Sequence, residues 1–117
     1  MQTTLFGIPN CDQVRKARAW LADRGIDHVF HDFKKSGIRG ALIAAWLVDV
    51  AADELINRKG TTWRGLSDVR KAQITNDQNA TALMLELPSV VKRPVLQTAD
   101  RTYVGFSDAT YQQIFKQ

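Results

Sequence analysis

The first third of the chain alternates between strand-like and helix-like patterns of hydrophobic residues. Residues 3–6 form a short β-prone run before Pro9, which predicts a strand that runs into a turn. Apolar residues then recur every three or four positions over residues 12–23, so we expect an amphipathic helix that ends at Gly25. Residues 28–33 hold a valine and two phenylalanines, and they predict a second strand. This βαβ order favours a parallel pair of strands.

The middle of the chain has helical periodicity. Apolar residues recur at turn spacing through residues 38–56, where Asp49 or Asp53 is a plausible break between two helices. Two more helices are expected over residues 67–74 and 77–87.

Polar residues and a proline mark the ends of these later helices. Ser67 and Asn76 are suitable N-caps, because their side-chain oxygens can accept from the open amides of a first turn. Pro88 is a stop signal. The basic, glycine-containing stretch over residues 57–66 is expected to be a loop.

The C-terminal part predicts two strands and a helix. Residues 95–98 and 102–105 form an antiparallel hairpin around a short turn, and Ser107 can cap a last helix over residues 108–116. The complete order is therefore βαβ, several helices, and ββα. This is the layout of an α/β, thioredoxin-like fold with a mixed sheet. We expect residues 1–117 to be one such domain, with a helical insertion at about 38–88 between the two halves.

Composition and charge exclude several classes of protein. The 117 residues are 44% hydrophobic, which is enough for one substantial core. The formal net charge of +4 comes from basic residues spread along the chain, so dedicated nucleic-acid binding is not favoured. Trp20, Trp46 and Trp63 lie in separate segments without the spacing of a base-stacking platform, and we expect them to pack in or around the core.

Targeting, redox and metal signals are sparse. We expect a cytoplasmic protein that does not interact with a membrane, because no apolar run has the length of a membrane span and the N-terminus lacks the pattern of a signal peptide. A single cysteine cannot form an internal disulfide. No metal site is expected, because His28 and His31, three apart on the predicted second strand, would point to opposite faces.

The single cysteine, Cys11, lies where the first strand gives way to the first helix. Unpaired backbone N–H groups at a helix start favour negative charge, so this position favours a reactive thiolate over a buried structural thiol. The adjacent charge of Asp12 opposes the thiolate, which limits this effect. Pro94 immediately precedes the hairpin, where it leaves the strand ladder intact. Thioredoxin-like folds have a cis proline at this place, whereas an ordinary X-Pro bond is trans.

Two segments, residues 10–21 (NCDQVRKARAWL) and 92–95 (KRPV), resemble the arsenate reductase ArsC/Spx family, most closely its YffB branch. The resemblance covers essentially the whole chain. It implies that Cys11 is the nucleophile and that Arg93, Arg58 and Pro94 belong to an oxyanion- or glutathione-binding site. Arg15 lies one helical turn after Cys11, where its guanidinium can stabilise the thiolate.

Two departures from the family pattern shape the expected function. The arsenate reductases carry a third arginine after the hairpin, and residues 103–107 contain none, so arsenate is not the expected physiological substrate. Spx-like proteins carry a second cysteine three residues after the first, where this chain has Val14. We therefore expect a thiol oxidoreductase whose Cys11 attacks an oxidised thiol substrate and is resolved by an external thiol, with glutathione as co-substrate.

Two alternatives remain open from the sequence. One is a non-catalytic, Spx-like regulatory module that binds RNA polymerase or another protein partner. The other is residual arsenate reductase activity.

Overall fold

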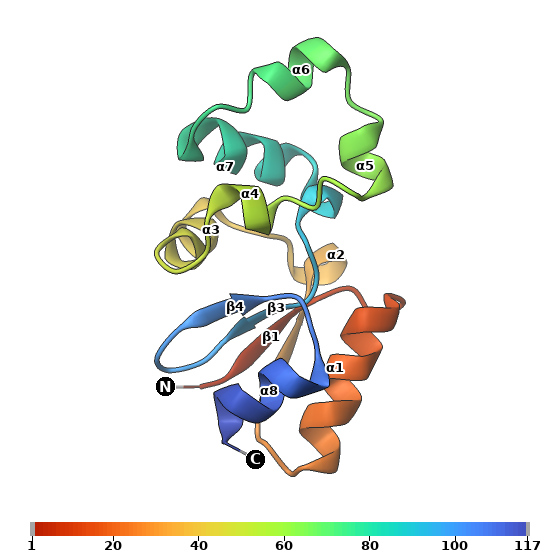
Figure 1. Cartoon of the computed structure of the whole chain (residues 1–117), viewed down its shortest axis with the longest axis vertical. Helices are drawn as coiled ribbons and strands as arrows, with labels where there is room; N and C mark the ends of the chain where they lie inside the picture. Colours follow the sequence, from red (N-terminus) through yellow and green to blue (C-terminus); the bar gives the residue numbers. More distant parts are fainter. Residues whose placement is uncertain (1, 117) are drawn as a thin grey trace. The chain divides into compact units, whose positions relative to one another are not determined.

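The computed structural model describes residues 2–116, which divide into two compact units (Figure 1). The first unit joins the segment up to Ser36 with the segment from Arg93 onward, and the second runs from Gly37 to Lys92. The helical unit thus extends beyond the predicted insertion of about 38–88. The extension has a local cause: the amide of Lys92 donates to the carbonyl oxygen of Leu55 at 2.8 Å, which ties residues 88–92 to the helical unit. The assignment of residues 1–117 to a single domain stays a prediction.

A four-stranded mixed sheet organises the first unit, with the strand order β2-β1-β3-β4. Strands β1 and β2 are parallel, whereas β1 with β3 and β3 with β4 are antiparallel. This is the predicted α/β, thioredoxin-like arrangement of βαβ followed by ββα. Its elements are β1 (Thr4–Gly7), α1 (Asp12–Asp23), β2 (Val29–Asp32), α2 (Phe33–Ser36), β3 (Val95–Gln97), β4 (Thr102–Val104) and α8 (Asp108–Phe115).

Local hydrogen bonds decide where the predicted elements begin and end. Helix α1 has the predicted bounds, and Gly25 ends it with a positive φ of 65°. The second strand is shorter than expected, because Asp32 accepts a hydrogen bond from the amide of Lys34 at 2.8 Å and starts the turn of α2. Phe33 is buried in this turn and does not continue the strand.

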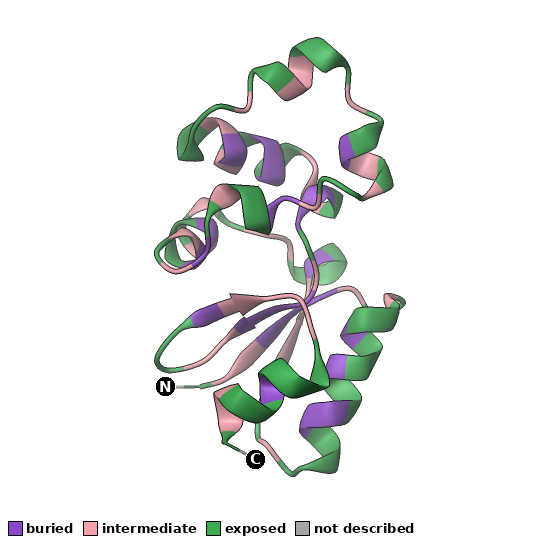
Figure 2. Cartoon of the chain, in the orientation of Figure 1, coloured by how far each residue is buried: buried purple, intermediate pink, exposed green. Residues whose placement is uncertain are grey.

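Apolar residues from both halves of the chain fill the core of the first unit. One side of α1 is buried, as Figure 2 shows, and it packs with residues of the sheet and of α8. The buried members of this cluster are Leu5, Ala17, Trp20, Leu21, Leu96 and Tyr111.

The second unit is helical. It contains α3 (Gly40–Leu47), α4 (Ala52–Leu55), α5 (Thr61–Arg64), α6 (Asp68–Ala72), α7 (Asp77–Glu86) and the 3-10 turn η1 (Pro88–Val90). Helices α3 and α7 pack together. Trp46 and Trp63 are buried in this unit, as Trp20 is in the first, so the predicted packing role of the tryptophans is confirmed.

The helix signals of the middle segment are largely confirmed. The break between two helices falls over residues 48–51, and the side chains of Ser67 and Asn76 cap α6 and α7 by accepting from backbone amides. The prediction of a loop over residues 57–66 is wrong in part, because the single-turn helix α5 forms there and buries Trp63.

Candidate functional site

Cys11 lies one tight turn after the carboxyl end of β1. Its amide donates to the carbonyl oxygen of Ile8 at 3.3 Å, which closes the turn, and its own backbone is extended, with φ −97° and ψ 128°. Cys11 is therefore the N-cap residue of α1. Its side chain is half-buried and makes no capping hydrogen bond within the part of the chain described. The thiol is thus adjacent to the open amides of a helix start, where negative charge is favoured.

Pro94 lies at the same end of the strands as this turn. Phe6 is opposite Val95 in the antiparallel β1–β3 pair, and one further step of the same register places Pro94 opposite Gly7. The Arg93-Pro94 peptide bond is cis, which settles the alternative that the sequence left open. Pro94 is buried, and its carbonyl oxygen accepts from the amide of Gly105 at 2.8 Å.

Arg15 makes hydrogen bonds to three consecutive residues around the thiol. Its Nη1 donates to Oδ1 of Asp12 at 2.7 Å, and its Nη2 donates to the carbonyl oxygen of Asn10 at 3.0 Å. Its backbone amide donates to the carbonyl oxygen of Cys11 at 2.9 Å. We did not expect these roles of Asn10 and Asp12 from the sequence. The i, i+3 spacing of Asp12 and Arg15 is the signal that indicates the ion pair.

Arg93 belongs to the same unit as Cys11. It directly precedes the cis proline, and its side chain is half-buried with a buried Nε. The backbone therefore places Arg93 at the end of the sheet where β1 leads to Cys11. Its role in binding a substrate stays a prediction.

Arg58 belongs to the helical unit. Its Nη2 lies 2.6 Å from Oδ1 of Asp53, and its guanidinium lies over the ring of Trp63, 4.7 Å from the centroid. These contacts hold the guanidinium of Arg58 in one place, although the side chain is 46% exposed. Its predicted contribution to the Cys11 site stays a prediction.

The two histidines have separate local partners. A ring nitrogen of His28 lies 2.9 Å from the carbonyl oxygen of Ile26, outside β2, and the ring of His31 packs against Phe6 at a centroid distance of 5.0 Å. Within residues 2–116 no group of three or more His, Cys, Asp or Glu side chains is arranged to hold a metal ion. No helix of that range is long and apolar enough to cross a membrane.

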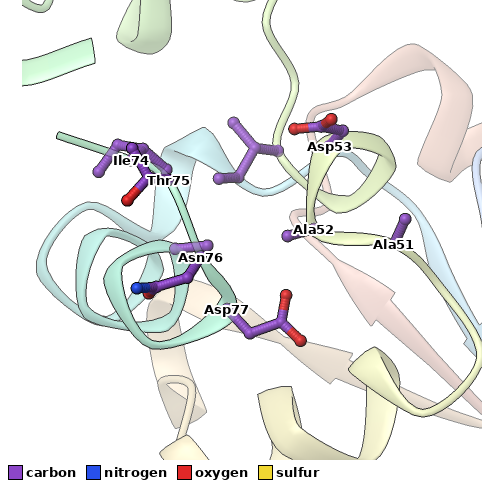
Figure 3. Close-up of a pocket in the computed structure, with 9 residues that line it drawn as sticks. Ala51, Ala52, Asp53, Ile74, Thr75, Asn76 and Asp77 are labelled. Atoms are coloured by element: carbon purple, nitrogen blue, oxygen red, sulfur yellow. The ribbon is translucent and has the colours of Figure 1, made fainter. Parts of the chain in front are cut away.

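The helical unit contains a pocket of about 270 Å³ between the segment around α4 and the start of α7 (Figure 3). Asp53 and Asp77 lie on it, and Asp53 is the residue that pairs with Arg58. None of Cys11, Arg15, Arg58, Arg93 and Pro94 lines this pocket. This pocket is therefore not the functional site that the sequence predicts.

The first unit defines the class of protein: a thioredoxin-like α/β fold that presents one thiol at the start of its first helix, at the end of the sheet where a cis proline immediately precedes the third strand. The comparison with known families is consistent with this class. The model of the ArsC family matches residues 6–114, and the chain belongs to that family.

Similar proteins cover nearly the whole chain. A solved YffB protein has 38% sequence identity and a TM-score of 0.90 over 96% of this chain and 97% of its own. An arsenate reductase (ArsC) related protein from Brucella melitensis has 44% identity and a TM-score of 0.77, over 100% and 97% of the two chains. The global transcriptional regulator Spx of Streptococcus pneumoniae is 27% identical over 90% of this chain and 79% of its own.

Proposed function

We propose that this protein is a thiol oxidoreductase in which Cys11 is the only nucleophile. One observation carries the proposal: the half-buried thiol is the N-cap of α1, at the end of the sheet where Pro94 immediately precedes β3. The helix start places open backbone amides next to the sulfur, and the Cys11 side chain makes no capping hydrogen bond within the described residues.

The reaction proposed is thiol–disulfide exchange. The Cys11 thiolate attacks one sulfur of an oxidised substrate, a new S–S bond forms, and the other half leaves as a thiolate with the electron pair of the broken bond. Because the chain has one cysteine, an external thiol must attack the mixed disulfide and release Cys11. Glutathione is the proposed co-substrate, and a reducing cytoplasm is the proposed location.

Basic side chains are proposed to bind the carboxylates of glutathione. Arg93 is half-buried next to the cis proline, and Arg15 lies one turn into α1. Charge-assisted hydrogen bonds from guanidinium groups suit carboxylates, which supports this assignment. Pro94 is proposed as part of the binding surface, and the contribution of Arg58 stays a prediction from the sequence.

Arsenate reduction is the less favoured activity. The similar protein from Brucella melitensis is described as related to arsenate reductase, which makes arsenate a substrate to test. However, residues 103–107 contain no arginine where the resemblance leads us to expect one. Loss of one charge-assisted partner of a bound anion costs about 1.5–3 kcal/mol, which corresponds to roughly ten- to a hundredfold weaker binding.

A regulatory binding module is the second candidate function, and the similarity to Spx favours it. Under this hypothesis the protein binds RNA polymerase or another protein without turnover. Val14, three residues after Cys11, means that an internal disulfide cannot control such binding. A stoichiometric complex that survives the Cys11→Ser substitution would support this function over the enzymatic one.

The decisive experiment is incubation with oxidised glutathione at neutral pH, followed by mass spectrometry of the intact protein. We expect one glutathionyl group per chain, and reduced glutathione should then remove it. Cys11→Ser is a matched control, because it removes the only sulfhydryl and leaves one hydroxyl in its place. Absence of the adduct on the wild-type protein would rule out the proposed exchange.

A further inference from the structure

The ion pair between Asp12 and Arg15 spans the reactive position. Arg15 holds the carboxylate of Asp12 at 2.7 Å and the carbonyl oxygen of Asn10 at 3.0 Å, and these two residues flank Cys11 in the chain. The guanidinium is thus held in place by the residues before and after the thiol. Two of its five N–H donors make these bonds.

Both members of the pair are exposed, which determines what the pair can do. The side chain of Arg15 is 58% exposed and that of Asp12 is 82% exposed. Exposed ion pairs of this kind add little to folding stability. Their charges still act on charged reagents that approach a neighbouring atom, over a range set by ionic strength.

Asp12 and Arg15 have opposite effects on an approaching anion. Arg15 alone would attract anionic reagents to the thiolate one helical turn away, and Asp12 alone would repel them. Because Nη1 of Arg15 and Oδ1 of Asp12 lie only 2.7 Å apart, the electrostatic effects of the two charges on an approaching molecule largely cancel. The pair therefore adds little net charge at the start of α1, although an arginine is present.

We propose that Asp12 is a specificity-determining residue, which masks the charge of Arg15 and so sets the preference of Cys11 between anionic and cationic disulfides. This inference rests on the proposed function, in which Cys11 attacks disulfides. It assigns to Asp12 the role of limiting how strongly Arg15 attracts anionic reagents. The exchange step itself is unchanged: the Cys11 thiolate forms one S–S bond, and the displaced thiolate leaves with the electron pair of the broken one.

The test compares two disulfides in the same variant. Oxidised glutathione is anionic and cystamine is cationic at neutral pH, and the ratio of their rate constants with Cys11 cancels changes in thiol reactivity that affect both. A second pair of probes, anionic iodoacetate and neutral iodoacetamide, reports the same charge preference without any disulfide chemistry. All four rates are measured at low salt, where surface charges act most strongly.

Asp12→Asn is the informative substitution, because it removes the charge and keeps an oxygen that Arg15 can bind. We expect it to raise the ratio of iodoacetate to iodoacetamide by roughly two- to threefold, as one unscreened charge near the thiol would, and the ratio of oxidised glutathione to cystamine by more, because these two reagents differ by more charges. Arg15→Gln should lower them by a similar factor, and the double variant should return close to the wild-type ratios. High salt should reduce all of these differences.

Asp23→Asn is the matched control. It makes the same change of net charge at the other end of α1, roughly 16 Å along the helix, and should leave the ratios unchanged. Unchanged ratios in both Asp12→Asn and Arg15→Gln would overturn the inference, as would an equal slowing of all probes. If oxidised glutathione and cystamine do not react but the alkylation ratios shift as expected, the masking is supported and the proposed function is the part that fails.

Discussion

Gly7 at the end of β1 lies directly against Val14 of α1. A Cβ atom at position 7 would be 2.6 Å from Cγ2 of Val14, closer than carbon atoms pack in proteins. Val14 is fully buried and β-branched, so it has few other rotamers available. The absence of a side chain at Gly7 therefore allows the first turn of α1, and with it Cys11, to lie close to the end of the strand.

Gly7→Ala should destabilise the protein by about 1–3 kcal/mol, because the added methyl group overpacks a buried contact. Urea unfolding at neutral pH measures the change. The control is Gly40→Ala at the start of α3, where the new Cβ would be 3.9 Å from Cδ1 of Leu85, an ordinary contact. We expect that variant to be neutral or more stable by up to about 1 kcal/mol, since alanine favours helix. Equal effects of the two substitutions would contradict this account of Gly7.

Asn76→Ala should cost about 1 kcal/mol through loss of the N-cap of α7. The side chain of Asn76 accepts from the amide of Asn79 at 2.8 Å, and alanine leaves that amide without the bond. Asn76→Asp is the control that keeps an acceptor and should remain near the wild-type stability. Chemical denaturation of both variants, analysed with a common slope, measures the difference. A loss as large in Asn76→Asp as in Asn76→Ala would show that capping is not the cause.

Asp108→Ala should cost about 1–3 kcal/mol, because it removes the acceptor of a buried indole N–H. Nε1 of Trp20 donates to Oδ1 of Asp108 at 2.6 Å, and this bond joins α1 to α8. Asp108→Asn retains an oxygen at this place and should lose much less. Thermal unfolding followed by circular dichroism distinguishes the two variants. If Asp108→Asn is as unstable as Asp108→Ala, the negative charge of Asp108, which lies in the first turn of α8 with Nη2 of Arg24 at 3.6 Å from Oδ1, is the main contribution instead.

Local signals predict much of this fold because they act within a few residues. The bounds of α1 and the caps formed by Ser67, Asn76 and Ser107 follow from periodicity and side-chain chemistry, and the structure confirms them. The hairpin of β3 and β4 is confirmed for the same reason. The short helix α5 is different. It forms in a glycine-containing stretch where propensity is weak, and burial of Trp63 accompanies it.

Contacts between distant positions account for what the sequence alone does not predict. Asp108 lies at the start of the predicted last helix, but its bond to Trp20 crosses 88 positions and depends on how α8 packs. The contact of Gly7 with Val14 likewise requires the crossing of β1 and α1. At the candidate site, the position of Cys11 follows from local patterns. The carbonyl oxygen of Asn10 as a partner of Arg15 requires the folded turn, because any backbone carbonyl is an equal candidate in the sequence.

Tyr111 should make the protein less stable at alkaline pH. Its side chain is fully buried, its hydroxyl has no hydrogen-bond partner within residues 2–116, and burial raises the pKa of Tyr111 well above the ordinary value of about 10. Above about pH 10 the unfolded chain therefore loses this proton while the folded chain keeps it. The unfolded state binds fewer protons, so the free energy of unfolding falls as the pH rises, by up to about 1.4 kcal/mol per pH unit from this group.

Tyr111→Phe removes this alkaline loss. At neutral pH we expect the variant to be as stable as the wild type or slightly more stable, because it deletes a buried hydroxyl that makes no hydrogen bond. Above about pH 10 its advantage should grow with pH, since phenylalanine has no proton to lose. Urea unfolding of both proteins at neutral pH and at about pH 11 measures the difference, and Tyr103→Phe controls for loss of a less buried tyrosine. A constant difference at the two pH values would show that Tyr111 ionises in the folded protein as readily as in the unfolded chain.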